Sequence, residues 1–248
     1  VTNHLAGTFQ WMQREWFGSP SYLRVHGRPL VLTFGPVYLQ QPEVWQAAMA
    51  ALPERPALFG LHHLWRLAGA DGGFTWVHRD PWEGTPPPRQ ILNRIGEVFA
   101  YFSSNVNEVI VSAFPGFNDV YAHENHHEID HRGGQTLRET LSVAMAGPWP
   151  LIQLVTWNDY GEGTMIEPTH EFGYTFLEII QQARRAEQGA AFAPGADDLR
   201  LPARLYALRK KGGNAAEELD RIANLLSDGD LPAARRLLDQ LDASPAAP

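Results

Sequence analysis

Residues 150–163 read PLIQLVTWNDYGEG, an apolar run that passes directly into a tryptophan, an asparagine, two carboxylates and two glycines. The apolar half has the composition of a buried strand, and the proline before it and the glycines after it mark its ends. In folds built around a parallel sheet, the groups that do chemistry follow the strands at their carboxyl ends. The stretch therefore predicts a strand and, directly behind it, a functional site.

The same alternation of apolar runs and helical stretches occupies most of the chain. Apolar residues recur with helical spacing at residues 4–17, 42–52, 89–104, 135–147 and 172–188. Short apolar runs predict five strands, at residues 29–35, 56–65, 72–78, 107–119 and 150–159. The helical signal between the second and third runs is weak. Near-continuous apolar strands that alternate with helices indicate an α/β fold with a parallel sheet covered on its faces.

In such a fold the ligand lies at the carboxyl ends of the strands, so the polar and aromatic residues found there become candidates for the site. The candidates at the ends of the inner runs are His62, His63, Trp76, Phe117 and Asp119. Those of the last run are Trp157, Asn158, Asp159, Tyr160 and Glu162.

The two carboxylates of the last run have the chemistry needed to cleave an acetal. Two glycines beside Asp159 and Glu162 let the backbone bend so that both carboxylates face one side. One carboxyl group can then donate a proton while the other accepts one, as glycoside hydrolysis requires. Trp157 and Tyr160 offer apolar faces on which sugar rings stack. In a purely structural alternative, the carboxylates cap the following turn and Trp157 belongs to the core.

Length and composition limit the classes of partner. With 248 residues, of which 44% are apolar and 19% charged, the chain is globular and fits one large domain with or without an appendage. A formal net charge of −8 provides no basic face for nucleic acid. No apolar run approaches the roughly 18 residues that cross a bilayer. We expect an oligosaccharide or polysaccharide partner, no nucleic acid and no transmembrane segment.

WNDYGEGTMIEP, residues 157–168, resembles the C-terminal strand-end motif of the related glycoside hydrolase families 71 and 99. Three further stretches agree with this motif: PSYLRVHGRPLVLTFGP (residues 20–36), SAFPGFNDVY (residues 112–121) and RGGQTLRETL (residues 132–141). The resemblance implies a (β/α)₈ barrel of the TIM type. It also implies a retaining or inverting enzyme that cleaves α-linked mannan or α-1,3-glucan without a metal or other cofactor.

The resemblance also implies a role for each acid. Asp159 matches the first acid, which in the mannan-cleaving branch acts as a base on the sugar 2-hydroxyl. Glu162 matches the second acid, which acts as the general acid and activates water. An aspartate at the first position follows the glucanase branch, whereas GEGTMIEP follows the mannanase branch, so both substrates stay open. Glu167 is a candidate for a supporting carboxylate.

The five runs correspond to strands four to eight of the family barrel, and the first strands have no counterpart before His4. Composition shifts after Gln188 to a linker rich in Ala, Pro and Gly, which amphipathic helices follow. We therefore expect a partial catalytic barrel over residues 1–188, a linker over 189–198, a helical C-terminal segment over 199–243 and a tail over 244–248. The first residues have no signal-peptide pattern. A signal peptide upstream of Val1 would make the protein secreted or periplasmic.

Two other functions compete with the glycosidase. Without the front strands, the chain fits a non-catalytic or degenerate carbohydrate-binding module that keeps the aromatic residues. HENHHEIDH, residues 123–131, contains H-E-x-x-H twice, the spacing of two zinc ligands on one helical face. Polar residues and the following RGG oppose a helix there, so we expect a loop in which His123, His127 and His131 do not converge. A zinc hydrolase is therefore the remote alternative.

Overall fold

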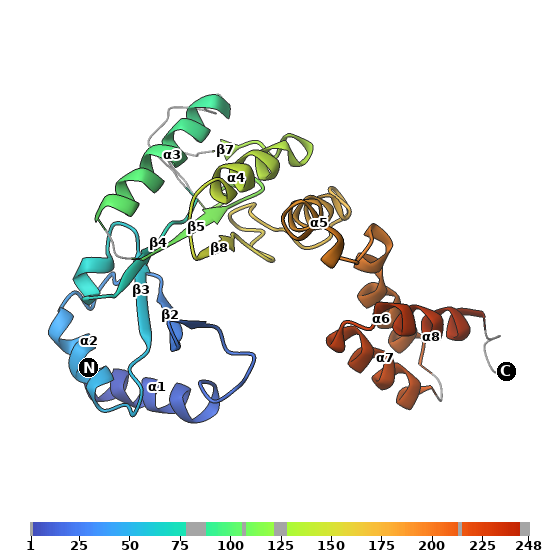
Figure 1. The fold of residues 1–248 in the computed structure, drawn as a ribbon, viewed down its shortest axis with the longest axis horizontal. Helices are drawn as coiled ribbons and strands as arrows, with labels where there is room; N and C mark the ends of the chain where they lie inside the picture. The colour runs from blue at the N-terminus through green and yellow to red at the C-terminus, as the bar shows by residue number, and fades with distance from the viewer. Residues whose placement is uncertain (1, 78–87, 106–107, 122–127, 213–214, 244–248) are drawn as a thin grey trace. The chain divides into compact units, whose positions relative to one another are not determined.

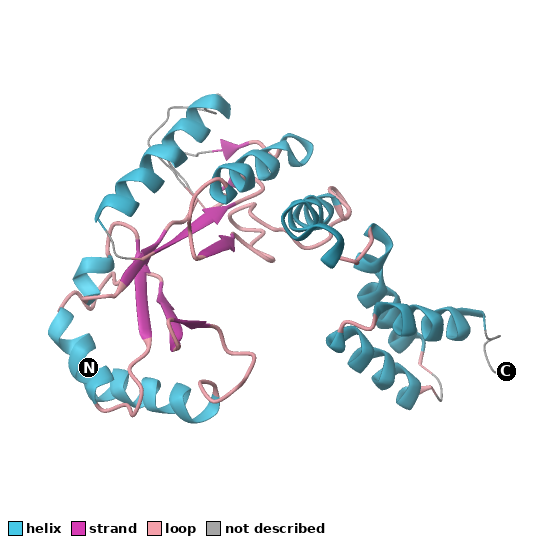
Figure 2. Ribbon diagram, viewed as in Figure 1, coloured by secondary structure: helices cyan, strands magenta, loops and turns pink. Residues whose placement is uncertain are grey.

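The computed structural model of the chain describes residues 2–77, 88–105, 108–121, 128–212 and 215–243. The chain divides into two compact units, Val1–Ile166 and Glu167–Pro248. A curved sheet with helices outside it forms the first unit, whereas the described part of the second unit is built around helices (Figures 1 and 2).

The sheet of the first unit has six strands among the described residues, in the order β1-β2-β3-β4-β5-β8. The strands are β1 (Arg24–Val25), β2 (Arg28–Thr33), β3 (Ala57–Leu61), β4 (Gly72–Phe74), β5 (Val109–Ala113) and β8 (Leu151–Leu154). Strand β1 is antiparallel to β2, and all other neighbours are parallel. The five parallel strands are the five predicted apolar runs, and they curve into a half-barrel (Figure 2).

Four helices of the first unit cover the outside of this half-barrel (Figure 1). They are α1 (Thr2–Glu15), α2 (Pro42–Ala50), α3 (Pro88–Asn105) and α4 (Gln135–Met145). Helix α2 begins at Pro42, a position at which the missing N–H breaks no helical hydrogen bond. Only a short 3₁₀ turn, η1 (Trp65–Ala68), joins β3 to β4, as the weak helical signal there predicted.

Two clusters of the apolar core join these helices to the sheet, and a third consists of strand residues such as Phe59, Phe74 and Ile110. Side chains of α2 and β3, among them Trp45, Met49 and Leu58, form one buried cluster with Phe9 of α1. A second cluster joins α3 and α4 to β5. Strands β3 and β5 are buried along their whole length, which explains why their sequences are apolar without alternation.

A row of polar side chains crosses three neighbouring strand ends of the half-barrel. Thr75 Oγ1 donates to Ser112 Oγ at 2.9 Å, and Ser112 Oγ donates to the Thr75 carbonyl at 2.6 Å. The Gln153 side-chain amide of β8 donates to Ser112 Oγ at 2.8 Å. Because Thr75 and Ser112 are buried, these bonds are needed to offset the loss of their contacts with water.

In the second unit, α5 (Thr175–Gln188) is followed by the 3₁₀ turns η3 (Gly189–Ala191) and η4 (Ala196–Arg200) and by the helices α6 (Leu201–Lys211), α7 (Ala216–Asp228) and α8 (Leu231–Ala243). Helices α6 to α8 share a leucine-rich core. Gly229 ends α7 in the left-handed conformation, and Asp230 Oδ1 accepts the Ala233 N–H at the start of α8. Every helix in the described ranges is too short or too polar to cross a bilayer.

Candidate active site

The two predicted acids lie on a closed loop at the carboxyl end of β8, here called the acid loop (residues 155–166). The loop leaves the sheet at Val155, whose N–H donates to the carbonyl of Ala113 at the end of β5, at 2.9 Å. Its two halves are then joined by the backbone bonds from Thr156 N–H to Thr164 O at 2.8 Å and from Ile166 N–H to Trp157 O at 3.0 Å. Main-chain hydrogen bonds therefore hold the backbone that carries the acids.

Asp159 organises the turn that leads to Glu162. The Glu162 N–H donates to Asp159 Oδ1 at 3.0 Å, and the Asp159 N–H donates to Thr156 Oγ1 at 3.0 Å. The bond from the Glu162 N–H spans three residues, the spacing of a helix N-cap, so the capping role considered as a structural alternative is present. A carboxylate has two oxygens and about four acceptor sites, so Asp159 can hold the turn and still act on a ligand.

Trp76, which follows β4, lies against the second acid. Its indole Nε1–H donates to Glu162 Oε2 at 3.4 Å, which is a long hydrogen bond. Phe34, the residue directly after β2, packs edge-on against the Trp76 ring with 4.9 Å between ring centroids. Trp76 and Glu162 are thus brought together from separate strand ends. The sequence interpretation did not include Phe34, because the apolar run at residues 29–35 predicts a strand and not an exposed end.

The segment after β5 runs beside the acid loop. Asn118 N–H donates to the Glu162 carbonyl at 2.8 Å, and Val120 N–H donates to the Gly161 carbonyl at 3.0 Å. Asp119 lies between these two bonds, so Asp119 and Asp159 are at the same end of the sheet, as predicted. The Tyr121 ring is so close to Gly161 that a Cβ built on the glycine would be 2.1 Å from a ring carbon.

His131 joins the acid loop to the hairpin of β6 (Phe117–Asn118) and β7 (Glu128–Ile129). Its Nε2 lies 2.7 Å from the carbonyl oxygen of Gly163. The ring also packs on Gly116, where a Cβ would come within 2.8 Å of ring carbons. The other three histidines of the tract, among them His123 and His127 of the H-E-x-x-H pattern, lie outside the described residues. Within the described ranges, no three His, Cys, Asp or Glu side chains are placed to hold a metal ion.

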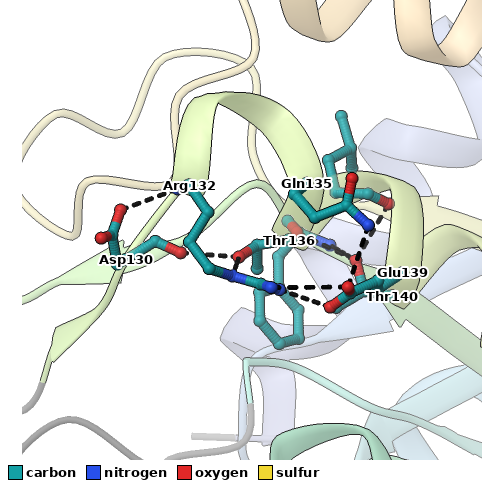
Figure 3. Close-up of polar contacts among 8 residues, drawn as sticks. Asp130, Arg132, Gln135, Thr136, Glu139 and Thr140 are labelled. Atoms are coloured by element: carbon teal, nitrogen blue, oxygen red, sulfur yellow. Dashed lines mark hydrogen bonds and ion pairs between the residues drawn. The ribbon is translucent and has the colours of Figure 1, made fainter. Parts of the chain in front are cut away.

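A polar network fixes the backbone on both sides of His131 (Figure 3). Asp130 Oδ1 accepts the Arg132 N–H at 2.7 Å, and the Asp130 carbonyl accepts the Thr136 hydroxyl at 2.6 Å. The Arg132 guanidinium donates to Thr136 Oγ1 at 3.1 Å and pairs with the Glu139 carboxylate. The hydrogen bond from Arg132 lowers the pKa of the Glu139 carboxyl below its usual value.

The remaining candidates occupy several different positions. His62 and His63 follow β3 with their rings edge-on at 4.7 Å, one strand further along the sheet from Trp76. Trp157 and Tyr160 are exposed, at 56% and 55%, and Asn158 between Trp157 and Asp159 is exposed too. Phe117 is 1% exposed and packs in the core with Phe114 and Ile129, away from solvent. Glu167 is the first residue of the second unit and is half-buried.

No family model matches the chain, and no curated protein matches it either. Among solved structures, it is similar to the GH99 endo-alpha-mannosidase from Bacteroides thetaiotaomicron, with a TM-score of 0.55 and 17% identity over 76% of this chain and 64% of that chain. A structure of the GH99 endo-alpha-mannosidase from that organism with bis-tris propane gives a TM-score of 0.53 and 18% identity, over 76% of this chain and 68% of that one. The chain thus spans about two thirds of these neighbours, and at this identity the likeness shows a GH99-like fold.

Proposed function

We propose that this chain carries the site of a glycoside hydrolase that cleaves α-linked glycans, with Glu162 as its general acid and Asp159 as its base. One observation carries the proposal: both acids lie on a loop fixed by its main chain at the carboxyl ends of parallel strands, with the Trp76 indole against Glu162. The GH99-like fold and the resemblance of residues 157–168 to the family 71 and 99 motif support it. The five parallel strands then correspond to strands four to eight of a (β/α)₈ barrel.

The proposed chemistry divides proton transfer between the two acids. Glu162 protonates the glycosidic oxygen while the bond from that oxygen to the anomeric carbon breaks. On one route, Asp159 takes the proton of the sugar 2-hydroxyl as its oxygen bonds to the anomeric carbon; ionised Glu162 then takes a proton from the water that adds to that carbon, the bond to the 2-oxygen breaks, and Asp159 returns its proton to that oxygen. On the other route, Asp159 takes the proton of the water that adds directly to the anomeric carbon, and both carboxyl groups then return to their starting states by exchanging protons with solvent. The long hydrogen bond from Trp76 orients the Glu162 carboxyl group in both states.

Sugar contacts come from the exposed rings and polar groups around the acid loop. Trp157 and Tyr160 suit stacking, and Asn158 and Asp119 offer hydrogen-bonding groups at the same strand ends. The other proposed contacts are His62, His63 and Glu167. A mannan and an α-1,3-glucan both fit these groups, so the proposal covers both glycans.

The proposal is tested by measuring the reducing ends that the protein releases from oligosaccharides of α-mannan and of α-1,3-glucan. We expect wild-type protein to cleave one of them and Glu162→Gln to lose most of that activity, since a positioned acid contributes about 10²- to 10⁴-fold. Glu97→Gln is the matched control, because Glu97 is an exposed carboxylate on α3 and should retain full activity. Equal rates for Glu162→Gln and wild type would reject Glu162 as the acid.

The second candidate is a carbohydrate-binding module without turnover. It is favoured by the exposed rings of Trp157 and Tyr160, which can stack on a sugar without turnover. Calorimetric binding of either glycan by wild-type protein that releases no reducing ends would select this candidate.

A further inference from the structure

Phe34 is a large apolar side chain at the edge of the candidate site that none of the roles above explains. We propose that Phe34, held by Trp76, forms a binding subsite for one neutral pyranose ring of the substrate, beside the Glu162 carboxyl group. The proposal rests on the proposed function for the identity of the ligand, an α-linked glycan.

The backbone holds Phe34 at a fixed place at the end of β2. The next residue, Gly35, has a φ of 155°, and its N–H donates to the Thr33 carbonyl at 2.9 Å. The Gly35 carbonyl accepts the N–H of Leu61, the last residue of β3, at 3.2 Å. A Cβ at Gly35 would lie 2.7 Å from the backbone nitrogen of Val37, so only glycine fits this turn. The turn therefore places the Phe34 side chain beyond the strand end.

Phe34 is 62% exposed although β2, the strand before it, contributes Leu30 to the core. Its contact with Trp76 is edge-on, with 81° between the ring planes, so this contact leaves much of the Phe34 ring uncovered. Removing an exposed apolar ring from water is favourable, so a ligand that covers the Phe34 ring gains binding free energy. Because the contact with Trp76 already restricts the ring, binding a sugar there costs little further side-chain entropy.

The chemistry of the two rings selects a sugar and sets its distance from the acid. The face of an aromatic ring is electron-rich and attracts polarised C–H groups, which one face of a pyranose presents as a flat array. The Trp76 ring contacts Phe34, and its indole N–H is bonded to Glu162 Oε2 at 3.4 Å. A pyranose on Phe34 is then separated from the Glu162 carboxyl by about the width of one indole. The subsite thus positions the substrate relative to the proton donor.

Binding measured without turnover tests the subsite. The probes are α-mannotetraose and the tetrasaccharide of α-1,3-linked glucose, titrated by calorimetry into Glu162→Gln protein. We expect Phe34→Ala in that background to weaken binding about tenfold, the scale of one lost aromatic contact with its buried area. Phe34→Trp should retain the affinity. The matched control is Tyr101→Ala, since Tyr101 on α3 is 61% exposed and should leave the affinity unchanged.

The possible results distinguish a failure of the Phe34 subsite from a failure of the proposed hydrolysis. If Phe34→Ala binds as tightly as its parent, the subsite is wrong even where the wild-type chain cleaves the glycan. If Phe34→Ala weakens binding and the wild-type chain never cleaves, the subsite stands and the proposed hydrolysis fails. If Glu162→Gln protein binds neither tetrasaccharide, the subsite is overturned as well. Because Phe34 is exposed, we expect its substitution to leave the melting temperature unchanged, which checks that the variants are folded.

Discussion

His131 Nε2 lies 2.7 Å from the carbonyl oxygen of Gly163, the residue that follows the proposed acid Glu162. The bond joins residues that are 32 positions apart and links the β6–β7 hairpin to the acid loop. With the proton on Nε2, the imidazole donates to the carbonyl, and the close packing on Gly116 holds the ring in this orientation. His131 is thus placed to position Glu162 through the peptide of Gly163.

Removing this bond should lower turnover more than substrate affinity. We expect His131→Phe, which keeps a ring but has no donor, to reduce kcat roughly 10- to 100-fold, because small displacements of a catalytic group have effects on this scale. KM should change little. His131→Gln keeps an N–H donor at the end of its side chain and should recover part of kcat. A His131→Phe protein with a lower melting temperature and a wild-type kcat would assign His131 to stability alone.

The left-handed backbone at Gly163 should make the acid loop sensitive to a single methyl group. Gly163 has a φ of 63°, and a Cβ there would lie 3.0 Å from the backbone nitrogen of Asn118. We expect Gly163→Ala to lower the free energy of unfolding by about 1–2 kcal/mol, measured by urea denaturation. Gly96→Ala is the control, because Gly96 lies in α3 with open space around it and should be stabilised by up to about 1 kcal/mol. Equal effects at the two glycines would contradict this role for Gly163.

The strands and helices of the half-barrel could be predicted because each leaves a local pattern. Strands such as β3 and β5 are buried on both faces, so their runs are apolar throughout, and the helices carry an apolar face with helical spacing. The direction of the strands then places Asp119 and Asp159 at one end of the sheet. Trp76 was expected at the same end for the same reason.

The contacts that the sequence did not predict depend on partners far along the chain. Phe117 was expected at the site because it follows an apolar run, but its pairing with Ile129 in the β6–β7 hairpin turns it into the core. The H-E-x-x-H pattern drew attention to His131 as a metal ligand, whereas its contact is a backbone carbonyl of Gly163. Every residue has a backbone carbonyl, so no sequence motif marks the one that His131 contacts.

The hydrogen-bonded row of Thr75, Ser112 and Gln153 predicts that the protein is less stable without the Ser112 hydroxyl. Ser112 Oγ accepts from Thr75 and from Gln153, so Ser112→Ala leaves two donors without this acceptor. We expect the free energy of unfolding to fall by about 1–3 kcal/mol in urea denaturation. Ser104→Ala, at an exposed serine of α3, is the control and should change stability by less than about 0.5 kcal/mol. A Ser112→Ala protein as stable as this control would show that the row contributes no net stability.

The ion pair next to His131 predicts how stability depends on pH. Hydrogen bonding to Arg132 lowers the pKa of Glu139 from 4.5, so below that pH the unfolded chain binds more protons at this group than the folded one. The stabilisation is therefore complete above pH 4.5 and is lost as the pH falls through the lowered pKa. We expect Glu139→Gln to be less stable than wild type by about 1 kcal/mol at pH 7, with a smaller difference at pH 3. A difference that is equal at both values, measured by urea denaturation, would exclude the ion pair as its source.

The dependence of rate on the leaving group tests the role of Glu162 as a proton donor. A sugar leaving group is a poor one and needs protonation as the glycosidic bond breaks, whereas an activated aryl leaving group departs as a stable anion. Glu162→Gln retains the size of the side chain and an acceptor for the Trp76 N–H but has no acidic proton. We expect it to slow cleavage of an α-linked oligosaccharide by about 10²- to 10⁴-fold and cleavage of the matching aryl glycoside by less than about tenfold.

Trp76→Phe is the companion variant, because it removes the N–H donor to Glu162 and keeps an aromatic ring beside Phe34. Because Trp76 acts through Glu162, this variant should slow the oligosaccharide more than the aryl glycoside, and by a smaller factor than Glu162→Gln does. An equal loss on the two substrates in Glu162→Gln would remove Glu162 from the role of general acid and leave Asp159 to be tested in its place.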